Sequence, residues 1–387
     1  MKVLFVMHGN NLQSGANLAM QEVIDYLHTN TDIDIDVLFP KIGVSSKEFY
    51  EQRNIQVHYS SYHRLLLSKT ESYLKRLIKI PLLLLRKKEM DHSCRSLRSL
   101  INDVDLIYSN TCTVYFGAML SKYYHKPHIW HIREYGDKDH NLIFPLGKKI
   151  YYGIDRKIDE RIVAISKGLK TDLSKYFPEK RIFLIYDDVD PKYDNPKEKL
   201  TPLDCYIILI AGDIKPGKGQ LEVVQAINIL VSRGINNIEL LVAGKVGDEA
   251  YYKKIVNVIK IGKLEKYVKF LGFVENMNEI RNVANIGVVA SPNEGFGRVT
   301  IEGMLSNMVM IGKNAGGTSE LIQNGYNGLL YNGGAEELAN AIASVVSNES
   351  YYLKLSLNGY RYGKEYIQGN CAEKVAALIY ETVGGNK

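Results

Sequence analysis

The chain of 387 residues has little cysteine and no long hydrophobic run. Its four cysteines are far apart and form no CxxC pair, which argues against a zinc site or a disulfide framework and fits a reducing compartment. No apolar run approaches the 18 or so residues that a membrane-spanning helix needs. The apolar start, residues 1–6, is too short for a signal peptide. We therefore expect a cytoplasmic protein, or one that is peripheral on the inner face of a membrane.

Excess charge is confined to one segment. The formal net charge is +6, and residues 64–98 hold ten Lys or Arg against three Asp or Glu, so this segment accounts for the whole excess. A chain that is near neutral elsewhere does not have the distributed basic surface of a nucleic-acid-binding protein. A hydrophobic content of 45% over this length is typical of two or three globular domains.

The basic segment has two interpretations. Leucine and isoleucine are interleaved there with cations, as in a helix that lies on an anionic leaflet. The other interpretation is an amphipathic helix that packs on its own domain and leaves its lysines solvated. Pro81 is expected to interrupt or kink a single helix. The membrane-surface candidates are Lys75, Arg76, Lys79, Arg86, Lys87 and Lys88.

Short apolar runs alternate with helical patterns in both halves of the chain, which predicts an α/β protein with two doubly wound, Rossmann-like domains. The absence of GxGxxG argues against a dinucleotide site. Residues 188–204 are polar, hold three prolines and are expected to form a linker. The predicted organisation is a first domain over 1–187, a second over 205–365, and a last helix over 366–387. The expected strands cover residues 2–8, 33–39, 55–59, 105–108, 128–131, 161–166, 181–187, 206–211, 238–244, 268–274, 285–290 and 308–311.

Residues 291–320 contain the most informative stretch. A buried-strand pattern over 285–290 is followed by a glycine loop and then by a helix that begins at Val299. Such a helix start presents unpaired N–H groups to a phosphate. Glu294 and Glu302 stand eight positions apart and can accept hydrogen bonds from hydroxyls. Although Glu302 alone would more often be a solvated helix residue, the combination fits a nucleotide sugar.

This stretch resembles the signature of the family 4 retaining glycosyltransferases of GT-B fold, of the bacterial polysaccharide, capsule or O-antigen type. In that family the first glutamate and the amides after it hold the donor sugar, and the second glutamate holds the ribose. The resemblance therefore implies these roles for Glu294 and Glu302. The implied donor-binding residues between them are Gly295, Phe296, Gly297, Arg298, Val299 and Thr300.

Residues 212–219 form a second glycine loop. The family usually has Gly-Arg-Leu at the start of this loop and Lys-Gly at its end, and the two cations neutralise the leaving diphosphate. Lys218 matches and Asp213 does not, while Lys215 supplies a point charge rather than a guanidinium fork. With Gly212, these residues are donor-site candidates by resemblance. Taken alone, Lys218 beside Gly219 is a moderate phosphate signal or a plain helix cap.

Three further positions match the donor site. Gly15 heads the first helix, where the family lets backbone approach the diphosphate or acceptor, although alone it is only a turn residue. Phe273 and Val274 match a segment whose backbone contacts the nucleobase, and the Phe273 side chain is equally a candidate for the core. Glu320 is a minor candidate with a helix-start alternative.

In the first half, polar residues follow strand patterns, where open α/β sheets place ligand sites. Family members have a histidine after one such strand that approaches the donor sugar, and His131 matches it. Asp187-Asp188 replaces the Asn-Gly pair usual in the family, and two acids would repel a diphosphate there. The cleft candidates beside His131 are Ser109, Asn110, Arg133 and Glu134.

The resemblance implies transfer of a hexose-type sugar from a UDP- or GDP-sugar to a glycan or lipid-linked acceptor with retention of configuration. Glu294, His131 and Lys218 are the implied catalytic residues. No metal or other cofactor is expected, and Asp137-Lys-Asp139 is interpreted as a solvated loop rather than a metal motif. A sugar-nucleotide epimerase, a phosphorylase and a non-catalytic donor-binding subunit remain alternatives.

Overall fold

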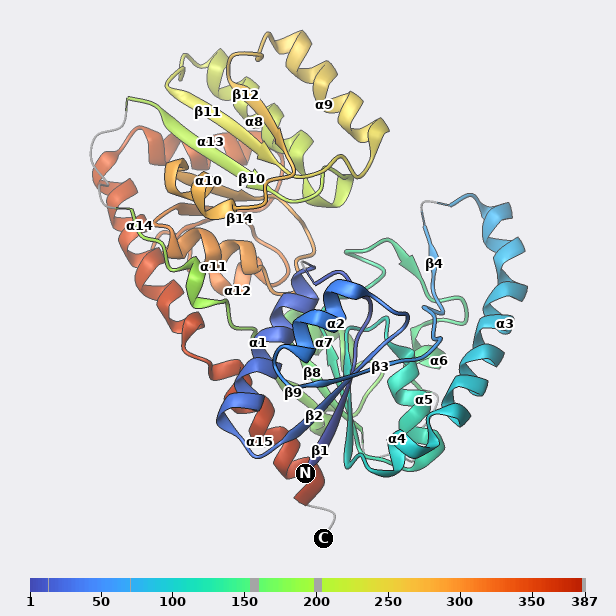
Figure 1. Cartoon of the computed structure of the whole chain (residues 1–387). Helices are drawn as coiled ribbons and strands as arrows, with labels where there is room; N and C mark the ends of the chain where they lie inside the picture. The colour runs from blue at the N-terminus through green and yellow to red at the C-terminus, as the bar shows by residue number, and fades with distance from the viewer. Residues whose placement is uncertain (13, 70, 154–159, 198–203, 385–387) are drawn as a thin grey trace. The chain divides into compact units, whose positions relative to one another are not determined.

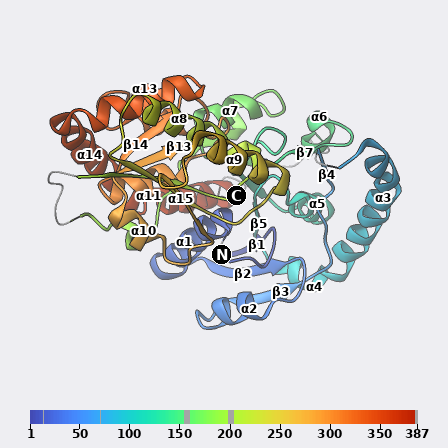
Figure 2. The same cartoon turned by 90° about the horizontal axis from the view of Figure 1, so that it is seen from above.

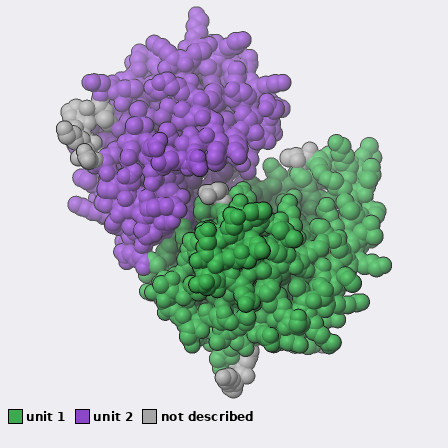
Figure 3. Space-filling view, viewed as in Figure 1, with its two compact units in different colours: residues 1–188, 369–387 green, residues 189–368 purple. Residues whose placement is uncertain are grey.

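The computed structural model describes residues 1–387 except 13, 70, 154–159, 198–203 and 385–387. The chain divides into two compact units, shown in different colours in Figure 3. Unit 1 comprises Met1–Asp188 and Gly369–Lys387, and unit 2 comprises Val189–Gln368. The segment expected to be a linker, 188–204, thus includes the start of unit 2, and its residues 198–203 lie outside the described residues.

Unit 1 is built on a parallel sheet of seven strands in the order β3-β2-β1-β5-β6-β8-β9 (Figure 1). Its central strands are short runs of Val, Ile, Leu and Phe. Such runs are typical of a parallel sheet, because helices cover both of its faces and bury every side chain. A small antiparallel pair, β4 (Leu67–Ser68) with β7 (Leu142–Ile143), stands apart from the sheet. The main strands are β1 (Lys2–Val6), β2 (Asp34–Phe39), β3 (Gln56–Tyr59), β5 (Leu106–Asn110), β6 (His128–Ile132), β8 (Glu160–Ala164) and β9 (Ile182–Leu184).

The last helix of the chain, α15 (Asn370–Gly384), belongs to unit 1. Its Cys371, Val375 and Ile379 lie in the same core as Met20 and Ile24 of α1. The other helices of unit 1 are α1 (Gly15–Asn30), α2 (Val44–Glu51), α3 (Tyr73–Ser96), α4 (Arg98–Asn102), α5 (Tyr115–Tyr124), α6 (Lys148–Tyr152) and α7 (Lys167–Leu173).

The basic segment forms one helix, α3, that continues through Pro81 instead of ending there. Proline removes one backbone donor, so the carbonyl of Leu77 loses its helical partner. Leu77 and Pro81 are both exposed, and water can hydrate that carbonyl. Figures 1 and 2 show α3 at the periphery of unit 1.

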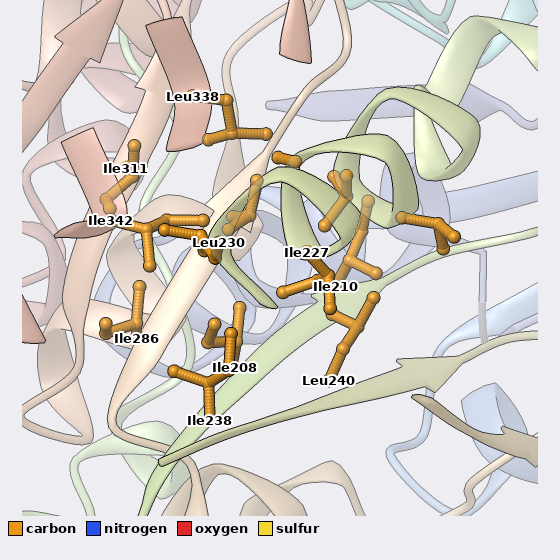
Figure 4. Packing of buried hydrophobic residues seen from close by; sticks show 14 of the residues in the cluster. Ile208, Ile210, Ile227, Leu230, Ile238, Leu240, Ile286, Ile311, Leu338 and Ile342 are labelled. Carbon is orange, nitrogen blue, oxygen red and sulfur yellow. The ribbon is translucent and has the colours of Figure 1, made fainter. Parts of the chain in front are cut away.

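Unit 2 has a parallel sheet of six strands in the order β12-β11-β10-β13-β14-β15. Figure 4 shows isoleucine and leucine side chains from strands and helices meeting in its core. The strands are β10 (Tyr206–Ala211), β11 (Ile238–Ala243), β12 (Val268–Gly272), β13 (Ile286–Val289), β14 (Val309–Lys313) and β15 (Leu329–Tyr331). The helices are α8 (Gln220–Ser232), α9 (Glu249–Gly262), α10 (Met277–Val283), α11 (Arg298–Leu305), α12 (Thr318–Leu321), α13 (Ala335–Val346) and α14 (Glu349–Gly363).

Both sheets reverse strand order at one point. In unit 1 the chain moves outward from β1 to β3 and then restarts beside β1 with β5. In unit 2 it moves from β10 to β12 and restarts beside β10 with β13. Ligands of open parallel sheets bind outside the carboxyl ends of the strands at such switch points. The predicted α/β fold with two Rossmann-like sheets is confirmed.

Candidate active site

The two glycine loops of unit 2 lie side by side at its switch point. One loop follows β10 and the other follows β13, its direct neighbour in the sheet. Gly219 begins α8 with φ +76°, and a Cβ there would come 2.7 Å from the Cβ of Ala290. Neither the left-handed conformation nor this close approach tolerates a side chain. The sequence therefore needs glycine here to place the start of α8 against the end of β13.

An ion pair joins these loops. Lys218 Nζ lies 2.6 Å from Glu294 Oε1, and the two side chains are 30% and 17% exposed. The structure thus brings together two predicted catalytic residues that stand far apart in sequence. An ammonium at the start of α8 is placed to contact a phosphate, and a carboxylate beside it can accept hydrogen bonds from sugar hydroxyls.

The loop that carries Glu294 is held in place by Gly317. The Gly317 N–H donates to the Glu294 carbonyl at 2.8 Å. A Cβ on Gly317 would come 2.3 Å from the Phe296 carbonyl oxygen, so only glycine fits. The Phe296 side chain is buried and packs on the Tyr366 ring, with centroids 5.8 Å apart. Phe296 therefore supports the loop by packing, and its backbone is what remains for a ligand.

Thr300 lies in the first turn of α11, as the motif implies. Its side chain is fully buried and its N–H donates to the Gly297 carbonyl at 2.8 Å. Gly297 starts α11 with φ +101°. The Thr300 amide is therefore engaged within the turn, and its assignment to the donor site stays a prediction. Arg298 and Val299, which precede Thr300 in the first turn of α11, are half-buried.

Glu302 is paired with an arginine that the sequence did not single out. Its Oε2 accepts a hydrogen bond from Arg281 Nη2 of α10, and both side chains are nearly buried. The Arg281 guanidinium in turn lies 5.1 Å from the centre of the Tyr193 ring. A buried carboxylate needs such a cation. Arg281 thereby fixes the orientation of the carboxylate that the resemblance assigns to ribose.

Phe273 lies on the surface. It is 62% exposed, and Lys245 Nζ lies 4.4 Å from the centre of its ring. The alternative that placed this side chain in the core is therefore wrong. The adjacent Val274 is half-buried. An exposed aromatic ring after β12, stacked under a cation, is available to a flat ligand such as a nucleobase.

The remaining unit 2 candidates differ in exposure. Asp213 is exposed, and its carbonyl accepts a hydrogen bond from Gln220 Nε2 at 3.0 Å. Lys215 is half-buried in the same loop. Gly212 has φ +133°, and a Cβ added to it would lie 3.6 Å from the Lys218 side chain. Glu320 is half-buried in the first turn of α12.

In unit 1, His131 lies in a buried polar cluster. Its Nδ1 is 2.8 Å from the Tyr108 hydroxyl, and its Nε2 is 3.9 Å from Asp187 Oδ1. The side chain is fully buried, and burial lowers its pKa well below the usual range, with Arg133 adding to the shift. His131 is therefore a neutral imidazole inside the sheet, 0% exposed, rather than an exposed group at its end.

Arg133 binds the acid that was expected to repel a diphosphate. Its Nη1 donates to Asp187 Oδ1, and its Nε donates to Asn110 Oδ1 at 2.9 Å. Arg133 and Asp187 are each only 4% exposed in their side chains. Asp188 accepts a hydrogen bond from the Cys371 N–H at 2.7 Å, near the start of α15. Both acids of the unusual pair are thus engaged inside unit 1.

The other cleft candidates of unit 1 are also internal. Ser109 is fully buried, with its Oγ 2.9 Å from His128 Nε2, so it does not reach a surface. Glu134 accepts a hydrogen bond from the Cys112 N–H at 2.9 Å, and burial raises its pKa. A Cβ on Gly15 would meet open space, so this glycine is not required by contacts within the chain.

His8 was missed by the sequence interpretation. It follows β1 at the unit 1 switch point, with its Nε2 3.4 Å from the Ser14 hydroxyl. Burial, together with the charges of Arg133 and His140, lowers its pKa to about 4. A histidine directly after a buried first strand was the available signal.

The acids Asp137 and Asp139 are bound by the protein itself. Asp139 accepts hydrogen bonds from the N–H groups of Tyr135 and Gly136, both at 2.8 Å, and Asp137 pairs with Lys148 at 2.7 Å. This loop is therefore internally bonded rather than merely solvated. Among the described residues, no group of three His, Cys, Asp or Glu side chains is placed to hold a metal ion. In the same residues no helix is long and apolar enough to cross a bilayer.

Two units, each with a doubly wound parallel sheet, are the components of the GT-B fold, and solved structures agree on this fold. The Anabaena protein Alr3699/HepE in complex with UDP has a TM-score of 0.76 at 20% identity, with all of both chains covered. Staphylococcus aureus TarM has a TM-score of 0.73 at 14% identity, with 99% of this chain and 100% of that chain covered.

Parts of the sequence are also similar to known glycosyltransferases. Residues 192–362 match the model of "Glycosyl transferases group 1". The uncharacterized glycosyltransferase MJ1178 of Methanocaldococcus jannaschii is 27% identical over 72% of this chain and 76% of its own length. The capsular polysaccharide biosynthesis glycosyltransferase CapM of Staphylococcus aureus is 28% identical over 51% of this chain and 55% of its own. The chain is thus similar to group 1 glycosyltransferases over a region that includes both glycine loops of unit 2.

Proposed function

We propose that the protein transfers a hexose-type sugar from a UDP- or GDP-sugar to a glycan or lipid-linked acceptor, with retention of configuration, in the synthesis of a cell-surface polysaccharide. The observation that carries the proposal is the Lys218–Glu294 pair at the unit 2 switch point. Structures of the similar HepE contain UDP and UDP-glucose, and the similar CapM is named for capsular polysaccharide biosynthesis.

The donor diphosphate would lie against Lys218 and the first turn of α11. Backbone N–H groups and an ammonium there are fixed in position before the reaction, so they stabilise negative charge as it develops on the leaving group. Glu302, held by Arg281, would accept hydrogen bonds from the ribose hydroxyls. Phe273 would offer its exposed ring to the base.

In the proposed reaction, the bond between the anomeric carbon and the diphosphate oxygen breaks. A bond from that carbon to the acceptor oxygen forms on the same face of the sugar, which retains the configuration. The acceptor's proton passes to the leaving phosphate oxygen, and the free nucleoside diphosphate is released. Glu294 would hold the sugar hydroxyls during this step. The proposal includes no metal ion.

His131 keeps a supporting role in this proposal. A neutral imidazole fixed by Tyr108 and held next to the Arg133–Asp187 pair can set the position of the groups around it. Its Nε2 has no hydrogen-bond partner among the described atoms, but the side chain is 0% exposed, so His131 would act on the site only through its neighbours. We also propose that the protein acts while peripherally associated with the inner face of a membrane.

The test is product analysis with a sugar-labelled donor. Transfer predicts that the label appears in a larger glycan or lipid and that free nucleoside diphosphate forms. An epimerase would instead leave the label in a nucleotide sugar, and a phosphorylase would need inorganic phosphate. A donor-binding subunit without activity would shift its melting temperature with UDP or GDP but release no diphosphate.

A further inference from the structure

The first half of α3 exposes an unusually dense set of apolar side chains. Eight of the twenty exposed large hydrophobic side chains in the described part of the chain fall within its residues 73–85. They include Ile78 at 76%, Leu74 at 71% and Leu84 at 67% exposure. The full set is Tyr73, Leu74, Leu77, Ile78, Ile80, Leu82, Leu84 and Leu85.

Five of these side chains, together with Pro81, share one face of the helix. At 100° per residue, Leu74, Leu77, Ile78, Pro81, Leu84 and Leu85 fall within an arc of about 120°. The buried residues Leu83, Met90 and Cys94 fall on the opposite side, where α3 packs on unit 1. The helix therefore packs on its own unit through a few side chains and turns its larger apolar face outward.

The cations occupy positions that the sequence pattern did not indicate. Lys79 pairs with Glu71 and, with Arg86, lines a pocket of about 320 Å³ on the inner side of the helix. The exposed Lys75 and Lys87 flank the apolar face, and the exposed Lys88 lies on the same side as the face, one turn after Leu84. Lysines at the edge of an apolar face can bury their stems and keep their ammonium groups at lipid headgroups.

We infer that the outward face of α3 over residues 73–85 inserts into the interface of an anionic lipid bilayer. The inference rests on the proposed function in one respect only, namely that a lipid-linked acceptor would be located at this bilayer. The charge of α3 favours an anionic bilayer over a second copy of the chain. The helix carries seven Lys or Arg against Glu89 and Asp91, so two copies packed through this face would bring like charges together. An anionic leaflet satisfies both the apolar face and its basic flanks.

The test is co-sedimentation of the full chain with vesicles of phosphatidylcholine, with and without roughly one third phosphatidylglycerol. The variant Leu74→Ser/Ile78→Ser/Leu85→Ser keeps every charge and the buried Leu83. We expect its partition coefficient on anionic vesicles to fall about tenfold or more, because the inserted area is lost. The matched control, Ile42→Ser/Val44→Ser/Ile261→Ser, removes side chains of similar exposure elsewhere and should bind as the parent does.

A second measurement reports insertion directly. Trp130 is the only tryptophan and is buried, so an Ile78→Trp variant adds one exposed probe over a constant background. Its emission should shift to the blue with anionic vesicles and be quenched by brominated lipid. Equal sedimentation of the Leu74/Ile78/Leu85 variant and the control, or no shift for Ile78→Trp, would overturn the inference. The inference would also be overturned if the parent were a dimer in solution and the Leu74/Ile78/Leu85 variant were a monomer.

Melting-temperature shifts with UDP and GDP separate this inference from the proposed function. The α3 variant should keep the parent's shift, because its substitutions lie far from Lys218 in sequence and in the other unit. Loss of vesicle binding with an unchanged shift supports the α3 surface. A parent that binds vesicles but neither nucleotide would contradict the proposed function and leave the membrane surface standing.

Discussion

Unit 1 and unit 2 both contain a parallel sheet with polar residues at a switch point, but their ion pairs differ in solvent exposure. In unit 2, Lys218 and Glu294 are 30% and 17% exposed on glycine loops. In unit 1, Arg133 and Asp187 are 4% exposed and bonded further to neighbouring side chains. An accessible pair can exchange its partner for a ligand, whereas a buried pair is held by the cost of leaving one charge alone. The pair in unit 2 is therefore accessible to a ligand, whereas the pair in unit 1 is part of the folded interior.

The largest expected effect is on turnover. Lys218→Ala and Glu294→Ala should each lower the rate of transfer by about 10³-fold, because a fixed charge opposite the leaving group or sugar is lost. The unfolding transition should stay near that of the parent. Release of nucleoside diphosphate measures the rate, and Lys253→Ala, an exposed lysine of α9, is the control. Near-normal turnover in either variant would remove its assignment.

The next effect is on stability and distinguishes the two pairs. Arg133→Met or Asp187→Leu should each lower the free energy of unfolding by about 3–5 kcal/mol, because one buried charge loses its partner. Lys218→Met should cost less than about 1 kcal/mol, as expected for a partly exposed pair. Urea unfolding followed by the fluorescence of Trp130 reports on unit 1, and circular dichroism covers both units.

The double variant Arg133→Met/Asp187→Leu is the control for this comparison. It removes both charges and should recover much of the stability that either single change loses. If the double variant is as unstable as the sum of the single ones, the pair is not the reason for the loss.

A smaller effect is expected at the loop contact of unit 2. Gly219→Ala should lower the free energy of unfolding by about 2–4 kcal/mol, because it adds strain at positive φ and a clash with Ala290. Gly234→Ala has a similar φ of +83° but meets no atom within 4 Å, so it should cost about 1 kcal/mol. Melting curves by circular dichroism measure both. Equal losses would show that the contact with β13 contributes nothing.

The smallest effect depends on pH. Burial raises the pKa of Asp188 to about 7 from an ordinary value of 3.8. Between those values the folded chain holds a proton that the unfolded chain releases, so the free energy of unfolding falls as pH rises. Asp188→Asn removes this dependence and should be more stable than the parent at pH 8 by about 1–2 kcal/mol, with no gain at pH 4. The same difference at both pH values would contradict the buried acid.

Much of the fold could be predicted because strands and glycine loops leave local marks in the sequence. The run 206–211 and the loop that ends in Lys218-Gly219 were recognisable from apolar periodicity and turn chemistry alone. The bounds of β13 and α11 follow from the same local signals. Pro81 does not interrupt α3, because a helix tolerates proline where the freed carbonyl stays hydrated.

The partners of the charged groups could not be predicted in this way. Nothing in the sequence links Arg281 to Glu302 or Arg133 to Asp187, because these contacts form only when separate elements pack. The outward face of α3 is a related case. Its periodicity showed an apolar face but not which side the rest of unit 1 would cover.

The central claim is that Lys218 binds the donor diphosphate at the unit 2 switch point. Isothermal titration of UDP and GDP into the parent, Lys218→Ala and Arg133→Met tests it most directly. We predict that the parent binds at least one of them, that Lys218→Ala weakens this affinity about tenfold or more, and that folded Arg133→Met keeps it. Equal affinity of the parent and Lys218→Ala would contradict the claim.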